Sequence, residues 1–277
     1  MGLVIGHNSC SSESSSSSVE AYDFLPSTNA KLAIGTKKMI EAYAGNLFRF
    51  RKSTGGTEFN VAAGTYGYPD VTTAQTNLGA DAGFMVRVYD NLGLYDAYWT
   101  ASTAPQPRLA MAKGDSRKAV QVAHILNQYM QCDMPVSAGE TWTLYISCRP
   151  SEMAGAWMLC GGVGTAFKWW INTDLTNRVY LYDGSSQNPV TGNYSIVQRA
   201  PQVIAIQFKT NALRVYVNGE LVLSHNTWAV LASAMFQIGR RVDGGGSIGQ
   251  FDWNGIYAHT GEYDSAINTK MCNMFLR

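Results

Sequence analysis

The chain of 277 residues has little charge. Lys, Arg, Asp and Glu make up 15% of it, and the formal net charge is +1. This balance produces no strong field, so we expect neither nucleic acid nor an anionic membrane as a partner. Apolar residues make up 46% of the chain, yet no apolar run reaches the roughly 18 residues that a membrane-spanning helix needs. The first six residues also lack the basic and long apolar segments of a secretory signal.

The sequence also lacks the residue spacings that mark common catalytic and metal sites. The cysteines are odd in number and no two have CxxC spacing: Cys10, Cys132, Cys148, Cys160 and Cys272. We therefore expect free, buried thiols and synthesis in a reducing cytoplasm. The four histidines show no zinc-ligand spacing, and no Gly-x-Ser-x-Gly nucleophile motif occurs. The glycine-rich segment 161–164 lacks the Lys-Ser or Lys-Thr of a phosphate-binding loop.

What the chain does have is a clear β-hairpin signal at residues 213–223. Two apolar, β-branched runs flank Asn218-Gly219, the pair that best tolerates the positive φ angles of a two-residue type I′ turn. From Thr141 onward, short runs typical of strands recur between turn residues: 141–147, 157–160, 167–171, 178–182, 203–208, 236–239 and 255–258. Many short antiparallel strands predict an all-β sandwich rather than alternating strands and helices.

The N-terminal part is organised differently. Residues 9–18 are almost all serine, and such a tract cannot offset its ordering entropy by burial. We expect an extended serine-rich arm over residues 1–20 and a single β-sandwich over 21–277. Ser27-Thr28-Asn29 is a capping sequence that predicts a short helix over about 30–43, ended by Gly45. Strands are expected at 47–51 and 84–89, and a short helix or strand at 264–275.

These features carry two resemblances. The second half, about 130–277, resembles the concanavalin A-like jelly roll of lectins and laminin-G-like domains, through the hairpin and the segments 236–240, 243–246 and 251–256. The first half resembles the start of the catalytic-domain family of fungal α-L-arabinofuranosidase B, relatives of which occur in phage virion proteins. The segments that carry this second resemblance are 39–45, 48–53, 89–93 (Tyr-Asp-Asn-Leu-Gly, against the family's Tyr-Asp-Gln-Ser-Gly) and 101–109.

The match to the arabinofuranosidases is incomplete, because neither of their catalytic carboxylates can be matched to a position here. We therefore predict no catalytic residues and a non-enzymatic structural virion protein of a tailed bacteriophage: a head, neck or tail decoration or fibre component. Its serine-rich arm would anchor it to other virion proteins in a homo-oligomeric or multi-copy assembly. Two alternatives remain open: a host-adhesion lectin that binds cell-surface carbohydrate, and a glycoside hydrolase.

Carbohydrate binding is the natural use of such a sandwich, because aromatic side chains stack on sugar rings. The candidates are Tyr66, Tyr68, Trp99, Trp169 and Trp170, although the same side chains also suit assembly contacts or an ordinary core. No cofactor is expected apart from calcium, which takes oxygen ligands. Asp243, Asp252 and Asn254 loosely resemble a calcium-ligand set, although the glycine-rich loop beside them also fits a simple turn.

Overall fold

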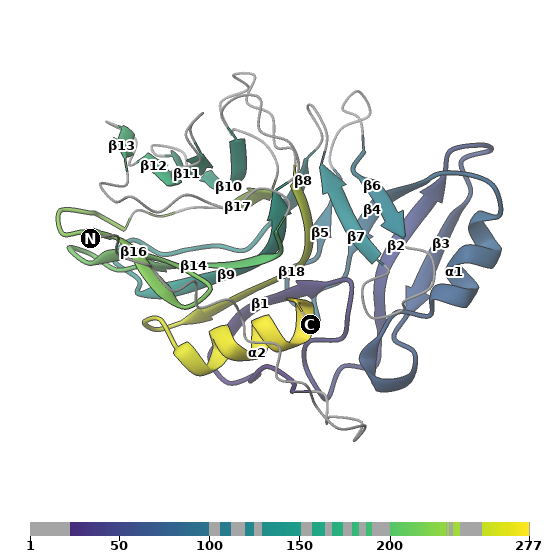
Figure 1. Cartoon of the computed structure of the whole chain (residues 1–277), viewed down its shortest axis with the longest axis horizontal. Helices are drawn as coiled ribbons and strands as arrows, with labels where there is room; N and C mark the ends of the chain where they lie inside the picture. Colours follow the sequence, from purple (N-terminus) through teal and green to yellow (C-terminus); the bar gives the residue numbers. More distant parts are fainter. Residues whose placement is uncertain are drawn as a thin grey trace, which may run out of the picture.

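The computed structural model describes residues 23–99, 106–111, 120–124, 129–150, 157–163, 168–173, 179–182, 187–189, 200–230, 232, 235–238 and 251–276. The predicted arm over residues 1–20 lies outside these ranges. Within them the chain forms two layers of antiparallel strands with two short α-helices (Figure 1). The predicted all-β sandwich is confirmed.

The first sheet lies against the C-terminal helix α2 (Ser265–Leu276). Its strands follow the spatial order β1 (Ala30–Gly35), β18 (Phe251–Thr260), β9 (Trp142–Pro150), β14 (Gln202–Phe208), β15 (Leu213–Val217) and β16 (Glu220–His225). In Figure 1 the helix runs along one side of this sheet, beneath β1 and β18. The segment predicted as a closing helix or strand is therefore a helix.

The second sheet begins near the short helix α1 (Val71–Leu78). Its order is β3 (Glu58–Ala62), β2 (Asn46–Lys52), β4 (Gly83–Val88), β5 (Ala97–Tyr98), β8 (Met130–Cys132), β17 (Met235–Ile238), β10 (Trp157–Val163), β11 (Lys168–Thr173), β12 (Val179–Tyr182) and β13 (Gln187–Pro189). Strands β6 (Arg108–Met111) and β7 (Val120–His124) connect β4 to β18, and so join the two sheets.

Strand β9 shows how the first sheet comes to be buried on both faces. Trp142, Leu144 and Ile146 enter the core between the sheets. Tyr145 points the other way, into a second core that lies between this sheet and α2. Because strands alternate their side chains, the second face also presents apolar residues, and helix α2 covers it together with Leu25, Met39 and Ile40. Strand β14 is accordingly buried along its whole length.

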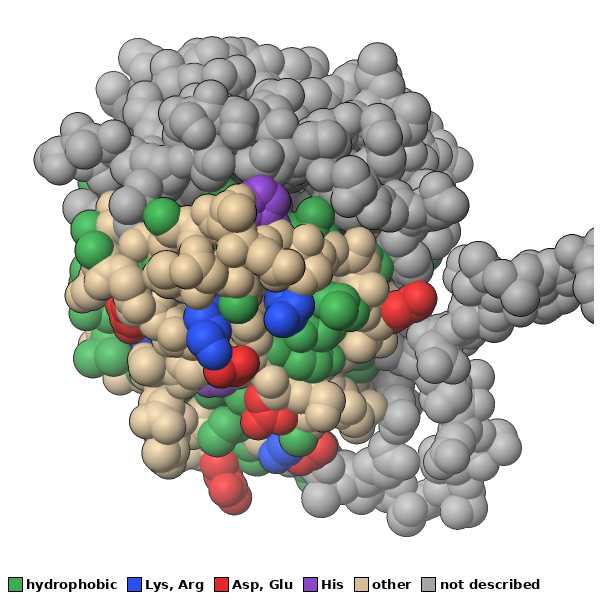
Figure 2. Space-filling view, turned by 90° about the vertical axis from the view of Figure 1, so that its left-hand side faces the viewer, with side chains coloured by type: hydrophobic (Ala, Val, Ile, Leu, Met, Phe, Trp, Pro, Cys, Tyr) green, Lys and Arg blue, Asp and Glu red, His purple; other side chains and the backbone are tan. Residues whose placement is uncertain are grey.

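The outer end of the first sheet is visible in Figure 2. Basic and acidic side chains are interspersed there among hydrophobic ones, and neither sign of charge dominates the visible described surface. Lys209, just after β14, and Glu262, just after β18, form an exposed ion pair at 2.6 Å. This mixed surface agrees with the near-neutral composition of the chain.

The predicted hairpin is confirmed. Asn218 and Gly219 have φ angles of 50° and 90°, as a type I′ turn requires. The Asn218 side chain has a further role, because its Oδ1 accepts a hydrogen bond of 2.9 Å from the backbone N–H of Val203. The turn is thereby tied to the neighbouring strand β14.

The predicted helix over about 30–43 is wrong, since residues 30–35 form strand β1. Leu32 and Ile34 enter the core between the two sheets, while Ala33 faces the second core, between the first sheet and α2. A Cβ atom on Gly35 would lie 3.1 Å from the backbone carbonyl oxygen of Asn254 and 2.9 Å from the Sδ of Met39, so glycine suits this close approach of β1 to β18. Pairing with β18 and burial on both faces outweigh the local capping signal.

Burial of His259 makes the stability of the fold depend on pH. This residue of β18 is 8% exposed, and its Nδ1 lies 3.0 Å from the carbonyl oxygen of Thr260. Burial lowers the pKa of His259, although the hydrogen bond to Thr260 and the charge of Asp264 offset part of this effect. The unfolded chain therefore takes up a proton near its ordinary pKa of about 6.5 that the folded chain resists.

We therefore expect the free energy of unfolding to fall as the pH drops below about 6.5. Above that pH His259 is neutral in both the folded and the unfolded chain, so it adds nothing to the pH dependence. His259→Gln removes the titrating group and should flatten part of this fall. The measurement is urea unfolding of both proteins at several pH values between about 7.5 and 5.5. Parallel pH profiles for wild type and variant would contradict the prediction.

Candidate carbohydrate-binding face

Polar side chains follow one cross-strand row of the second sheet. In backbone register, successive partners are Asn60, Arg49, Arg87, Tyr98, Gln131 and Gln237, from β3, β2, β4, β5, β8 and β17. We call these six residues the polar row. The register continues through Gly161, Trp170, Tyr182 and Gln187. Cross-strand partners share a sheet face, so the polar row forms one surface.

The polar row lies on the face directed away from the core. Its sequence neighbours on the opposite face are fully buried in the core between the sheets: Phe48, Val88, Ala97, Cys132 and Ile238. The row residues themselves are half-buried, apart from the exposed Asn60. A row of amide, guanidinium and phenol groups offers both hydrogen-bond donors and acceptors, as recognition of sugar hydroxyls requires.

One end of the polar row is already hydrogen-bonded. The Nε of Arg49 and the hydroxyl of Tyr89 both donate to Asn60 Oδ1, each at 2.9 Å. The guanidinium of Arg87 lies 5.9 Å from the centre of the Tyr89 ring, which is cation–π distance. These contacts fix long side chains in place before a ligand binds, which lowers the entropy lost on binding.

The middle of the row is organised around Asp133. Tyr98 donates to its Oδ2 at 2.6 Å, and Gln131 Nε2 donates to its Oδ1 at 2.9 Å. The hydrogen bond to Asp133 raises the pKa of Tyr98 to about 12. The phenol therefore stays protonated at neutral pH and acts as a donor that holds Asp133, not as a nucleophile.

The amide of Gln237 lies next in the row and has an unused acceptor. Its Oε1 is buried and has no hydrogen-bond partner among the residues that the structure describes. A buried acceptor without a donor is costly, and such groups in folded proteins commonly await a ligand or water. Among the described residues, Gln237 Oε1 is thus an unsatisfied acceptor inside the row, next to Gln131 in the register.

Two carboxylates lie one position beyond the short β5–β8 ladder. Ala97 pairs with Cys132 and Tyr98 with Gln131, so continuing the register places Asp96 opposite Asp133. Residues directly opposite each other on neighbouring strands have Cβ atoms about 4.5–5.5 Å apart, so this register brings two carboxyl groups side by side, as glycoside hydrolysis requires. The contacts of Asp96 hold it in place, since its Oδ1 accepts from the Asp90 N–H at 2.9 Å and its Oδ2 lies 3.4 Å from Arg87.

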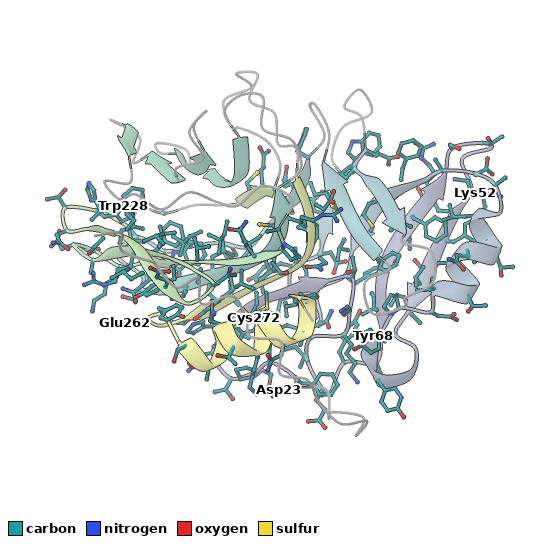
Figure 3. All side chains as sticks on the ribbon, viewed as in Figure 1. Asp23, Lys52, Tyr68, Trp228, Glu262 and Cys272 are labelled. Atoms are coloured by element: carbon teal, nitrogen blue, oxygen red, sulfur yellow. The ribbon has the colours of Figure 1, made fainter. Side chains whose placement is uncertain are left out.

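The structure places the aromatic candidates from the sequence in different parts of the chain. Trp99 is half-buried and directly follows Tyr98 of the row. Trp170 belongs to the backbone register of the row and Trp169 is its neighbour in β11; the side chains of both lie outside the described set. Tyr66 and Tyr68 lie on the loop after β3, where Tyr66 is exposed and Tyr68, labelled in Figure 3, is half-buried. Carbohydrate binding by these residues stays a prediction.

The calcium candidates are not assembled into a site by the described residues. Asp252 is 2.5 Å from Arg149 Nη2 in an ion pair, and Asn254 Nδ2 donates to the Phe275 carbonyl at 3.4 Å. Asp243 lies outside the described ranges. Among the residues that the structure describes, no group of three or more His, Cys, Asp or Glu side chains could hold a metal ion.

Sequence reasoning missed both Asp96 and Asp133. Neither stands in a motif, and strands β6 and β7 lie between them in the sequence. The signal that brings them together is the pairing of β5 with β8, which the sequence does not reveal. Within the described part of the chain, no helix combines the length and apolar character needed to cross a membrane.

No protein-family model matches the sequence, and no curated protein matches it. Solved structures do. An arabinofuranosidase complexed with arabinofuranosyl-α-1,2-xylobiose matches with a TM-score of 0.72 and 13% identity, over 88% of this chain and 62% of that one. A mutant GH54 α-L-arabinofuranosidase soaked with 4-nitrophenyl α-L-arabinofuranoside gives the same values. A Trypanosoma rangeli sialidase has a TM-score of 0.49 at 13% identity, over 68% of this chain and 30% of that one, and we infer nothing from this weaker match.

These comparisons establish the fold and correct the predicted function. The lectin-like sandwich is confirmed, and the chain spans 62% of the length of the arabinofuranosidase chains. The prediction of a non-enzymatic structural protein of a phage particle is wrong, because the solved structures that share the fold are glycoside hydrolases and nothing in the comparisons supports a virion role.

Proposed function

We propose that the chain is a glycoside hydrolase that binds carbohydrate along the polar row. The observation that carries this proposal is the placement of Asp96 opposite Asp133, on the exposed face and beside the row. Hydrolysis of a glycosidic bond uses two carboxyl groups. One protonates the leaving oxygen, and the other attacks the sugar carbon or activates the water that does so.

The surrounding residues supply the remaining requirements. Tyr98 and Gln131 orient Asp133, and Arg87 with the Asp90 N–H orients Asp96. The outer row residues Asn60, Arg49 and Arg87 offer hydrogen bonds to sugar hydroxyls. Hydrogen bonds from these neighbours hold the two carboxylates in a fixed orientation, which side chains without such partners would not keep.

An α-L-arabinofuranoside is the substrate class that we propose. Support comes from the solved structures of the same fold, which are arabinofuranosidases studied with arabinofuranosyl ligands. Sequence identity is 13%, so the fold alone does not establish this substrate. The row itself favours a neutral sugar, because the cations Arg49 and Arg87 each have an acidic neighbour, Glu58 and Asp96.

The test is hydrolysis by the purified chain of 4-nitrophenyl α-L-arabinofuranoside and of xylan that carries arabinofuranosyl branches. We expect release of nitrophenol and of arabinose. The double variant Asp96→Asn/Asp133→Asn is the background control, because it keeps the shape of both side chains without their acid–base chemistry. Equal release by wild type and double variant, or no release by either, would overturn the proposal.

A further inference from the structure

The loop after β3 presents an exposed tyrosine in a strained backbone conformation. Tyr66 is 62% exposed, and its φ and ψ angles are 57° and 23°. This left-handed region is rarely adopted by residues other than glycine and asparagine. Backbone strain of this kind persists where the surrounding structure holds it and is concentrated at functional sites.

The surrounding structure does hold this loop. Gly64 N–H donates to the Tyr68 carbonyl at 2.6 Å, and Lys38 N–H donates to the Gly67 carbonyl at 2.8 Å. An antiparallel bridge between Ala63 and Pro69 closes the base of the loop. Tyr66 is therefore fixed in an outward position by backbone contacts on both sides.

Tyr68, in the same loop, connects it to the body of the protein through Lys37. Its half-buried ring lies 5.0 Å from the buried ammonium group of Lys37, at cation–π distance. Lys37 in turn donates to the Met274 carbonyl at 2.8 Å, which ties the loop to helix α2. The platform beneath Tyr66 is thus rigid, which reduces the entropy cost of binding to it.

The residues around Tyr66 favour a sugar ring over a protein as its ligand. The next exposed residues along the chain are small or polar, including Gly64, Thr72 and Thr73. A protein-binding hot spot is normally enclosed by neighbours that exclude water. A solvated aromatic face without large apolar neighbours along the chain is better matched to a carbohydrate, which has one apolar face and polar edges.

We propose that Tyr66 is an accessory subsite that stacks on a sugar ring of a polymeric glycan, outside the position where bonds are cleaved. This inference rests on the proposed function, and it implies that the preferred substrate of the hydrolase is a polysaccharide. The polar row passes through Asn60 of β3, and the Tyr66 loop begins just beyond the end of that strand. A long chain can reach both, whereas a small glycoside reaches only the row.

The experiment compares binding of soluble arabinofuranosyl-substituted xylan by wild type, Tyr66→Gly, Tyr66→Phe and Leu221→Ala. We expect Tyr66→Gly to raise the Kd about tenfold, since an aromatic contact is worth about that factor in affinity. Tyr66→Phe keeps the stacking face and should bind as wild type does. Leu221, which is 49% exposed on β16, is the matched control and should have no effect.

Two further readouts separate binding from folding and from catalysis. Glycine relieves the strain at a φ of 57°, so the Tm of Tyr66→Gly should equal or exceed that of wild type. Its kcat/KM on 4-nitrophenyl α-L-arabinofuranoside should be unchanged. Wild-type xylan affinity in Tyr66→Gly, no xylan binding by wild type, or loss of self-association instead of glycan affinity would each overturn the subsite. Xylan binding through Tyr66 without hydrolysis would leave it standing and refute only the proposed catalysis.

Discussion

Replacing Asp133 with asparagine should lower kcat on an arabinofuranosyl substrate by about 10²–10⁴-fold, the range that a positioned acid or base contributes. The asparagine side chain has nearly the same shape and can still accept a hydrogen bond from Tyr98. Fold and substrate affinity should therefore remain close to those of wild type. Asp96→Asn should cause a loss in the same range, because hydrolysis requires both carboxyl groups.

The double variant distinguishes a shared catalytic role from two separate structural ones. Groups that act as a unit are strongly non-additive, so the double variant should be little worse than the more impaired single variant. Glu220→Gln is the matched control, because this exposed carboxylate lies in the hairpin of the first sheet. Full activity in either single aspartate variant would remove that residue from the mechanism.

The hairpin at Asn218-Gly219 shows which parts of the fold could be predicted from sequence. Its signal is local, since two residues with positive φ angles determine the turn and the flanking runs supply the strands. The alternation in β9 was equally local. Strand β1 was mistaken for a helix because the deciding contacts, with β18, come from the other end of the chain.

The candidate site was out of reach of sequence reasoning for the same physical reason. Each strand of the polar row is short and ordinary by itself, and the row exists only in the register of strands that are distant in sequence. Gln131 and Gln237 become neighbours through a single β8–β17 pairing. The aromatic candidates were chosen by residue type, which identifies groups suited to sugar binding but not the face on which they meet.

Asp90 lies in a segment that the sequence comparison singled out, but its role becomes clear only in the structure. It belongs to the segment 89–93, which resembles a family motif, and the structure shows its buried carboxylate bonded to the backbone of the surface turn that follows it. Its Oδ1 accepts from the N–H groups of Ala33 and Leu92, and its Oδ2 from those of Leu94 and Tyr95, at 2.9–3.1 Å. Asp90 itself is 1% exposed.

Asp90→Ala should therefore lower the free energy of unfolding by about 3–5 kcal/mol, because it leaves one buried and three partly buried N–H groups without their acceptor. The loss is smaller than the sum over four donors. Burial raises the pKa of Asp90, and the backbone hydrogen bonds offset part of that rise, so part of their energy compensates for desolvation of the carboxylate. The measurement is urea unfolding of wild type and variant at constant pH.

Asp90→Asn provides the internal comparison for this prediction. The amide keeps one acceptor oxygen, which can serve two of the four N–H groups, but its NH₂ group faces the other two as a donor. We expect its loss of stability to lie between zero and that of Asp90→Ala. If both variants unfold at the wild-type urea concentration, the loop does not depend on Asp90. If Asp90→Asn is the less stable of the two, repulsion between facing donors outweighs the retained hydrogen bonds.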